Sequence, residues 1–302
     1  FIEASGMVTI NGTLTANGGI GNAYKGSGAG GSILISCRTV AGSGVLTANG
    51  ANMSTSNGGE GGGGRIAIHY DTAAQSLLPL PLLKTSVAAG TYAVSDSVGE
   101  FGSIYFSDTA LLGEVLTDFK GWVHIPQFSS WSPQKLVMTN SFLGIASSPF
   151  ALSVAGSVSG KGDRMVALQD EATVNVGGSV ESNIRLGDGS RMEINGDLKI
   201  PSTAAVAAYL SRSYGSEVHA GGDLELANKW HFTSAPTNEA CEYGGLIEVG
   251  GCFSIISPGL LYLASDSTNG GAPLIKSERF YVSKTGVINA DERGFGNTPL
   301  KG

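Results

Sequence analysis

The sequence predicts an all-β protein, a parallel β-helix or β-solenoid with irregular rungs, glycine-rich loops and at most one short inserted helix. Three observations predict it: short segments in which apolar and polar residues alternate, two motifs that repeat along the chain, and an uneven excess of glycine. Strict alternation is the period of a β-strand, whereas an amphipathic helix needs a period of about 3.6 residues. Because one such short unit cannot enclose a core alone, its neighbours must stack on it.

Composition excludes several classes of protein. The chain has 302 residues, of which 46 are glycine, and 18 of these glycines lie in residues 1–64. They lack the period of three that a collagen triple helix requires. No apolar run reaches the roughly 18 residues that a membrane-spanning helix needs, so we expect no membrane span. The net charge of −7 argues against nucleic acids and anionic membrane surfaces as partners.

The first repeat occupies residues 1–110 and predicts a glycine-rich module of three rungs. Its pentapeptide Leu-Thr-Ala-Asn-Gly stands at 14–18 and recurs at 46–50, which is 32 residues later. Each copy precedes a glycine-rich stretch and then a short apolar strand, at 31–35 and 64–68. A weaker third copy completes the module. We expect the glycine stretches to pack as tight backbone arches, because glycine permits the close approach of two backbones.

A second motif, apolar-x-apolar-x-Gly-x-apolar, recurs through residues 111–302, which we interpret as a continuation of the same solenoid. The spacing between its glycines varies between 18 and 29 residues in the second half of the chain. Two explanations of the glycine remain open: a tight bend at a corner, or a bulge that switches the strand faces. The predicted structural glycines are Gly12, Gly156, Gly178, Gly196, Gly222, Gly251 and Gly286.

Three segments interrupt the repeats. The first, residues 201–215, contains the best helix candidate, AAVAAYLSR at 204–212, which follows a proline and a serine. Residues 227–244 are expected to form a second insertion. Residues 76–84 are apolar and broken by prolines, so we expect them to pack on the solenoid as a crossing loop.

The two ends of the chain resemble each other. Residues 286–302 look like the start of a further copy of the first repeat, because both ends place a Gly-x-Gly-Asn sequence shortly after an apolar-polar-Ala-Asx sequence. A consensus shared by all rungs is the alternative explanation. Neither end carries a capping helix or a charged rung, and uncapped ends favour stacking. The expected partners are therefore adjacent repeats or other copies of this chain.

The pairing of Leu-Thr-Ala-Asn-Gly with a glycine loop and a Gly-Gly-Arg-Ile-Ala-Ile strand resembles the glycine-rich parallel β-helix repeats of large bacterial extracellular and cell-surface proteins. Residues 43–70 carry the likeness best. The resemblance implies an extracellular or cell-surface location and a structural or adhesive role. It implies no catalytic residues, because these repeats share no active-site motif.

One pair of carboxylates is a candidate for catalysis. Asp197 and Asp223 stand just before the last apolar residue of their motif copies, so they should stack at the ~4.8 Å spacing of paired strands. A close carboxylate pair would suit the acid–base chemistry of a polysaccharide lyase or hydrolase. The alternative is a solvated outward row that discourages pairing at the strand edges.

The sequence predicts no cofactor and no metal site. The glycines of residues 58–64 lack the lysine of a phosphate-binding loop, and a strand rather than a helix follows them. The four histidines form no metal-binding or protease motif, and we interpret them as surface or packing residues. The acidic residues show no spacing that requires a calcium site.

Three cysteines make no disulfide framework, because their number is odd. Cys37 follows Ile33 and Ile35 with a period of two, and we expect it to point inward as a small apolar residue. Cys241 and Cys252 are close in sequence and could form a disulfide in an oxidising compartment.

Three functions remain open. The first is a structural extracellular β-solenoid, the repeat unit of a surface fibre, filament or stalk, which is not an enzyme. The second is an adhesin or module that binds cell-surface glycans, in which Trp122, Trp131 and Trp230 stack on sugars instead of sealing the core. The third is a polysaccharide lyase or hydrolase that uses the two aspartates.

Overall fold

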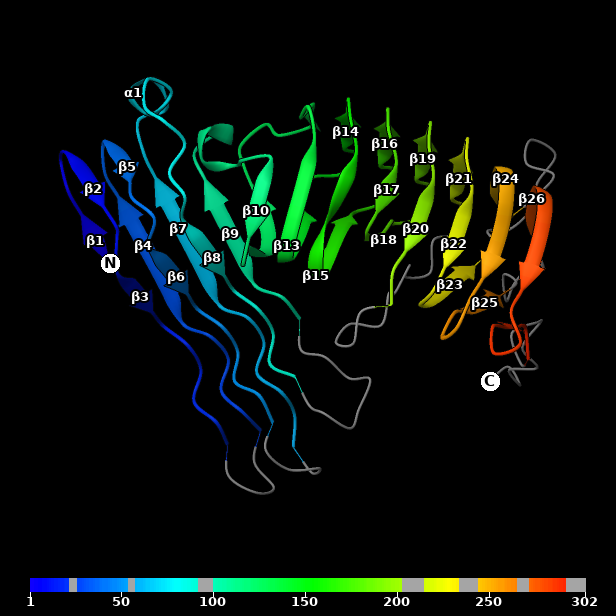
Figure 1. Ribbon diagram of the computed structural model, residues 1–302. Coiled ribbons are helices and arrows are strands. Elements are labelled where there is room, and N and C mark those ends of the chain that lie inside the picture. The colour runs from blue at the N-terminus through cyan, green and yellow to red at the C-terminus, as the bar shows by residue number, and fades with distance from the viewer. Residues whose placement is uncertain are drawn as a thin grey trace, which may run out of the picture. The chain divides into compact units, whose positions relative to one another are not determined.

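Strands dominate the part of the chain that the structure describes (Figure 1). Helical residues occur in that part only in α1 (Thr72–Gln75) and in the 3-10 turn η1 (Thr109–Leu111). The prediction of an all-β protein with little helix is therefore confirmed. Within the same ranges no helix is long and apolar enough to cross a membrane. The computed structural model describes residues 1–21, 26–53, 58–91, 100–202, 215–233, 244–264 and 272–291.

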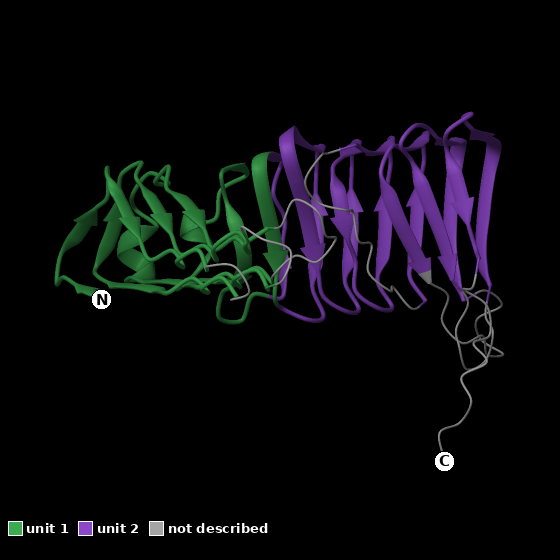
Figure 2. Cartoon of the chain, turned by 90° about the horizontal axis from the view of Figure 1, so that it is seen from below, with its two compact units in different colours: residues 1–128, 139–146 green, residues 129–138, 147–302 purple. Residues whose placement is uncertain are grey.

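The chain divides into two compact units (Figure 2). Unit 1 comprises Phe1–Phe128 and Thr139–Ala146, and unit 2 comprises Ser129–Met138 and Ser147–Gly302. In both units, strands that are 18 or more residues apart in the sequence pair in parallel. The hydrogen-bonded neighbour of a strand is thus its counterpart in the next copy of the repeat.

Unit 1 is built from short parallel strands. They are β1 (Ile2–Glu3), β2 (Met7–Thr9), β3 (Thr13–Thr15), β4 (Ser32–Ser36), β5 (Thr39–Ala41), β6 (Val45–Thr47), β7 (Arg65–His69), β8 (Lys84–Ser86), β9 (Ser103–Phe106), β10 (Val115–Thr117), β11 (Lys120–His124) and the second part of β13 (Leu136–Ile145). β4 pairs with β1 and β7, and β7 also pairs with β9. β6 lies between β3 and β8, and β2 pairs with β5.

Unit 2 continues the parallel pairing. β14, β16, β19, β21, β24 and β26 pair in that order, as do β17, β20, β22 and β24, and a separate sheet holds β23, β25 and β27. The strands are β12 (Ser130–Trp131), β14 (Ala151–Val154), β15 (Val158–Leu168), β16 (Thr173–Val176), β17 (Val180–Glu181), β18 (Asn183–Arg185), β19 (Arg191–Ile194), β20 (Leu198–Ile200), β21 (Glu217–Ala220), β22 (Leu224–Leu226), β23 (Lys229–Thr233), β24 (Gly245–Ile255), β25 (Leu260–Ala264), β26 (Pro273–Val282) and β27 (Val287–Asn289).

The core of unit 2 consists of columns of apolar side chains. Val176 of β16 pairs with Ile194 of β19, which in turn pairs with Ala220 of β21. All three are buried, whereas Asn175, next to Val176, is exposed. Because paired strands lie ~4.8 Å apart, equivalent side chains of successive copies touch along each column. The inward placement predicted from the alternating pattern is therefore confirmed for these residues.

The glycine-rich loops of unit 1 pack backbone against backbone. Figure 1 shows them running side by side beyond β3, β6 and β8. The Gly30 N–H donates to the Gly62 carbonyl at 2.9 Å, and the Gly90 N–H donates to the Gly61 carbonyl at 2.8 Å. A Cβ on Gly30 or Gly61 would lie closer than 3.0 Å to a carbonyl oxygen of a neighbouring segment. These loops therefore have the tight packing expected of them.

Residues 76–84 differ from the expectation of a packed crossing loop. They follow α1, whose N-cap Asp71 accepts the Ala74 N–H at 3.0 Å. Leu77 is 84% exposed and Leu82 is 74% exposed, so the leucines of this segment are only partly packed. The apolar composition thus creates an exposed hydrophobic surface in unit 1.

Other predicted segments are described only in part. The helix candidate at 204–212 lies outside the described residues. Part of the stretch 227–244, expected as an insertion, forms β23, which pairs with β25 and buries Trp230 completely. Of residues 286–302, those up to Asp291 are described and include β27.

A charge at an inward position should unfold unit 2. Val176→Asp places an unpaired carboxylate in the apolar column, and we expect it to lower the free energy of unfolding by about 3 kcal/mol or more. Asn175→Asp is the control, because this neighbouring side chain is exposed. Chemical denaturation measures both variants. Equal stability of the two variants would contradict the inward assignment.

One added methyl group should distinguish the packed glycines from the open ones. Gly61→Ala forces a Cβ against the Gly28 carbonyl, and we expect it to destabilise the protein by about 1–3 kcal/mol. Gly59→Ala lies in the same loop, where a Cβ meets no atom within 4 Å, and should change stability by about 0.5 kcal/mol or less. Thermal unfolding compares the two, and a Gly61→Ala protein as stable as the Gly59→Ala protein would refute the backbone packing.

Candidate functional site

Side-chain hydrogen bonds connect successive motif copies in unit 2, at the bend that follows each motif strand. Ser157 Oγ accepts the Ser179 N–H at 3.0 Å, and Ser179 Oγ accepts the Asp197 N–H at 3.1 Å. Asp197 Oδ1 then accepts the Asp223 N–H at 2.9 Å, and Asp223 Oδ1 accepts the Cys252 N–H at 2.8 Å. We call this series the corner ladder. Each side chain satisfies a backbone donor of the following copy, which a bend would otherwise leave unpaired.

The motif glycine makes room for the corner ladder. A Cβ on Gly222 would lie closer than 3.0 Å to Asp197 Oδ1, the atom that accepts the next hydrogen bond. The Gly222 N–H donates to the Gly196 carbonyl at 3.0 Å, so the backbones of the two copies also touch. The glycines lie at bends between strands, which favours the corner explanation over the bulge. The glycines that face a ladder side chain in this way are Gly178, Gly196, Gly222 and Gly251.

The remaining predicted glycines have other surroundings. A Cβ on Gly156 would lie 2.9 Å from the Gln134 carbonyl oxygen, and a Cβ on Gly286 would lie against the Ile255 carbonyl oxygen. At Gly12 a Cβ would meet no atom within 4 Å. Glycine is therefore required by space at two of these three positions, and Gly12 tolerates a side chain.

The two aspartates predicted as a stacked pair do lie on neighbouring copies. They precede Leu198 and Leu224, which are register partners in β20 and β22. Oδ1 of each aspartate accepts a backbone N–H of the next copy. The geometry of Asp197 and Asp223 is thus accounted for by the hydrogen bonds that hold the copies together.

Unit 1 contains a related series built from the asparagines of its pentapeptide. Asn17 Oδ1 accepts the Asn49 N–H at 2.7 Å, and Asn49 Oδ1 accepts the Ala88 N–H at 2.8 Å. The Ser86 hydroxyl also donates to Asn49 Oδ1 at 2.7 Å. The repeated asparagine therefore has the same function as the serines and aspartates of the corner ladder.

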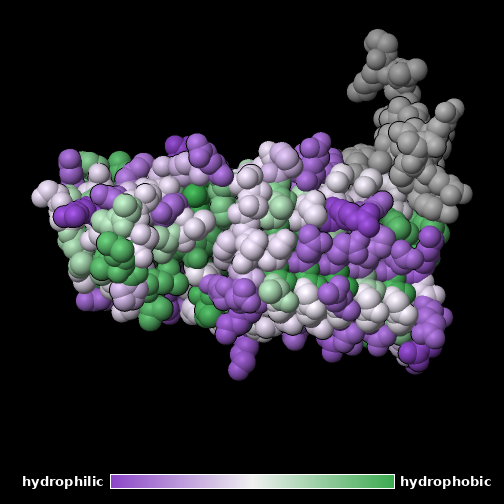
Figure 3. Space-filling view, turned by 90° about the horizontal axis from the view of Figure 1, so that it is seen from above, coloured by the Kyte–Doolittle hydropathy of each residue, from purple (hydrophilic) through white to green (hydrophobic). Residues whose placement is uncertain are grey.

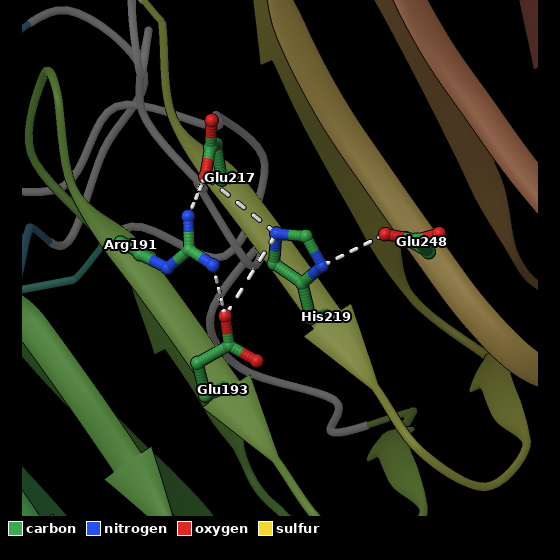
Figure 4. A network of polar contacts seen from close by, with 5 residues as sticks. All are labelled: Arg191, Glu193, Glu217, His219 and Glu248. Carbon is green, nitrogen blue, oxygen red and sulfur yellow. Dashed lines mark hydrogen bonds and ion pairs between the residues drawn. The ribbon is translucent and has the colours of Figure 1, made fainter.

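A charge network on β19, β21 and β24 is the most polar cluster of unit 2 (Figure 4). The Arg191 guanidinium lies 2.6 Å from Glu193 Oε1 and also contacts Glu217. Nδ1 of His219 lies 3.0 Å from Glu248 Oε2. Nε2 of His219 lies 3.6 Å from Glu217 Oε2 and 3.9 Å from Glu193 Oε1. Three carboxylates, one guanidinium and one imidazole thus lie on the same face.

This charge network links three successive copies. Glu193, His219 and Glu248 are register partners, because each stands between the first two apolar residues of its motif. Aligning the motif copies on that position would have found the column, whereas the search for histidine pairs within one segment did not. Solvent-facing ion pairs contribute about 0–1 kcal/mol each, so the network adds modestly to stability. Among the described residues no group of histidine, cysteine and acidic side chains could hold a metal ion.

An open groove of about 390 Å³ lies beside the charge network. Its wall contains alternating polar and aliphatic residues from β14, β16 and the bends after them. Hydroxyl and amide groups in this wall can donate and accept hydrogen bonds. The polar residues that line the groove are Ser132, Gln134, Ser153, Asn175, Glu193 and Asn195.

The other histidines have packing roles, as predicted. His69 and His231 each pack against a tyrosine ring. His124 is the last residue of β11, and burial lowers the pKa of its imidazole. Only His219 therefore lies among several carboxylates in the part of the chain that the structure describes.

The tryptophans of the sugar-stacking hypothesis are separate from one another in the strands. Trp230 is fully buried and packs edge-on against Phe232, with ring centroids 5.9 Å apart. Trp122 packs edge-on against Phe142 at 5.6 Å. Trp131 in β12 is partly exposed. Trp230 thus fits the alternative interpretation, in which the ring seals the core.

The cysteines leave one prediction open. Cys37 is half-buried, and burial raises the pKa of its thiol, which fits a packing residue. Cys241 lies outside the described residues, so its pairing with Cys252 stays a prediction.

A double-mutant cycle tests the corner ladder. Gly222→Ala should destabilise the protein by about 1–3 kcal/mol, because the new methyl group meets Asp197 Oδ1. In an Asp197→Ala background the same change should cost less, with a coupling energy of about 1 kcal/mol. Gly12→Ala is the control glycine. Additive effects of the two substitutions in urea unfolding would show that the glycine is needed for another reason.

Comparison with models of protein families, with curated protein sequences and with solved structures finds no match. The likeness to glycine-rich parallel β-helix repeats therefore rests on the repeated motifs themselves. Function has to be derived from three observed features: the corner ladder, the columns of apolar side chains and the faces that unit 1 and unit 2 present to solvent.

Proposed function

We propose that this chain is a structural β-solenoid of an extracellular surface, a repeat unit of a fibre, filament or stalk that stacks on further repeats or copies. The exposure of the apolar columns at the outermost strands carries this proposal. Phe253 of β24 is fully buried, whereas its register partner Phe280 of β26 is 44% exposed. Likewise, Leu261 of β25 is buried and Ile288 of β27 is exposed.

The first strand of unit 1 has the same property. Ile35 of β4 is buried, whereas its partner Ile2 of β1 is exposed. Burying an aliphatic or aromatic side chain is worth about 1.5–3 kcal/mol, so an added strand would stabilise either edge. The edges also carry backbone groups that can pair with a further parallel strand.

The hydrogen bonds between copies support a structural role. In the corner ladder the same interaction recurs at every bend from Ser157 to Cys252. Stability in such an array is the sum of contributions from neighbouring copies, so length can be added without changing the design. The two aspartates support this role rather than an enzymatic one, because each already accepts a backbone hydrogen bond.

Glycan binding is the second candidate, and the open groove of unit 2 favours it. Its hydroxyl and amide side chains match the hydroxyl groups of a sugar in number and kind. Aliphatic wall residues such as Val154 and Val176 offer apolar contact in between. A surface fibre and a glycan-binding groove are compatible in one molecule.

Charges at the outermost strands should block stacking. Sedimentation velocity and electron microscopy of the purified chain should show assemblies that grow with concentration. Replacing Phe280 and Ile288 together by Glu should shift the population to monomer, because a charge would have to be buried at each junction. Leu77→Glu is the control, since Leu77 is more exposed and lies on no strand.

A monodisperse wild-type monomer at every concentration would contradict stacking between separate copies. The tandem version is then tested with two copies of the sequence in one chain. Their junction should raise the thermal midpoint above that of the single copy, and an unchanged midpoint would contradict that version as well.

A glycan array tests the second candidate. Wild-type protein should bind a defined set of glycans, and Asn175→Ala should weaken that binding about fivefold through the loss of a groove hydrogen bond. Glu225→Ala, on another strand, is the control. Silence of the array with folded wild-type protein would eliminate glycan binding through this groove.

A further inference from the structure

A small apolar pocket of about 260 Å³ lies in unit 1. The segment after α1 forms one wall, with Leu80 and Leu83, and β9 and the chain around β10 form the other, with Phe106, Leu116 and Phe119. Figure 3 shows hydrophobic residues gathered on the surface of unit 1. Leu82 and Val115 line the pocket and are also well exposed, so they stand at its mouth.

A close approach of two segments shapes this pocket. A Cβ on Gly113 would lie 2.6 Å from Leu80 Cδ2, so a larger residue would push this wall outward. The leucines are held against the strands and yet remain partly uncovered. Exposed aliphatic side chains around a concave apolar surface are typical of a binding site.

One polar group breaks the apolar wall. Thr85 of β8 lines the pocket and is 2% exposed, and its hydroxyl has no hydrogen-bond partner among the described residues. An unpaired buried hydroxyl is costly, so such groups commonly meet a ligand or a water molecule.

The register of β8 shows that this hydroxyl replaces an apolar side chain. Leu14 of β3 pairs with Leu46 of β6, and Leu46 pairs with Thr85. The same column therefore reads leucine, leucine, threonine. Threonine is smaller than leucine, so the third copy exchanges apolar filling for a hydroxyl at the position where the pocket lies.

The charges near the pocket are already paired. Lys84 Nζ lies 2.9 Å from Asp118 Oδ2, and Asp118 Oδ1 accepts the Asn140 amide at 2.8 Å. Lys120 Nζ donates to Asn140 Oδ1 at 2.9 Å. The Lys84 and Asn140 contacts hold the pKa of Asp118 below its usual range, so the carboxylate stays ionised and paired. No cation near the pocket mouth in this described network is left to attract an anionic ligand.

We propose that this pocket binds a neutral, short alkyl chain that carries one oxygen atom, such as an aliphatic alcohol, with the Thr85 hydroxyl hydrogen-bonded to that oxygen. The volume fits a small molecule: a cavity of about 150 Å³ accepts benzene, and drug-sized ligands need about 300 Å³ or more. The leucine and phenylalanine side chains take up the chain, and Thr85 selects a ligand with an oxygen over a pure hydrocarbon.

Isothermal titration calorimetry with 1-hexanol tests the proposal, with hexanoate as the anionic comparison. Wild-type protein should bind 1-hexanol saturably and more tightly than hexanoate. Thr85→Val keeps the shape and removes the hydroxyl, and should weaken 1-hexanol binding roughly three- to tenfold. Thr85→Ser keeps the hydroxyl and should restore most of the affinity. Thr117→Val is the matched control, because Thr117 also lines the pocket but is exposed.

A filling substitution provides a second readout. Thr85→Leu installs the residue found in the two preceding strands of the column. It should abolish 1-hexanol binding and raise the thermal midpoint, because it removes an unpaired hydroxyl and fills the space. The proposal is overturned if folded wild-type protein binds no 1-hexanol, if hexanoate binds more tightly, if Thr85→Val binds 1-hexanol as tightly as wild type, or if Thr85→Leu still binds it.

Discussion

The close approach of successive copies at the bends is the constraint on which the rest of the structure depends. Parallel strands in register bring equivalent residues of neighbouring copies together, and at the bend only one of two adjacent positions has room for a side chain. In unit 2 this side chain is the serine or aspartate of the earlier copy, and the glycine of the later copy lies under it. The motif is therefore a relation between two copies, because neither residue is explained by its own segment alone.

Glycine serves two different purposes in the two units. In unit 2 it yields space to a neighbouring polar side chain, so one glycine per copy suffices. In unit 1 whole loops lie backbone against backbone, and long runs of glycine are needed to let carbonyl oxygens of adjacent loops approach. The glycine excess near the N-terminus therefore indicates dense packing. It also makes unit 1 poor in side chains that could recognise a ligand, apart from the apolar segment after α1.

Much of the fold could be predicted because its signals are local. Alternation at Val174 and Val176 identifies the buried face without any knowledge of the partner strand. The charge network around His219 could not be predicted in this way, because its members are 24 or more residues from Glu193 or Glu248 and the spacing between copies varies. The unpaired Thr85 hydroxyl is also invisible in the sequence, since its meaning comes from the leucines aligned with it in β3 and β6.

The corner ladder has a direction, and this limits the symmetry of any assembly built on it. The accepting side chain always belongs to the earlier copy, and the donating N–H always belongs to the later one. A two-fold dimer places identical patches against each other and so would bring acceptors to acceptors at such an edge. A contact that extends the ladder joins unlike edges instead and is heterologous. Because heterologous contacts close only into rings and otherwise continue without limit, the hydrogen bonds of a single bend already specify polar, head-to-tail growth.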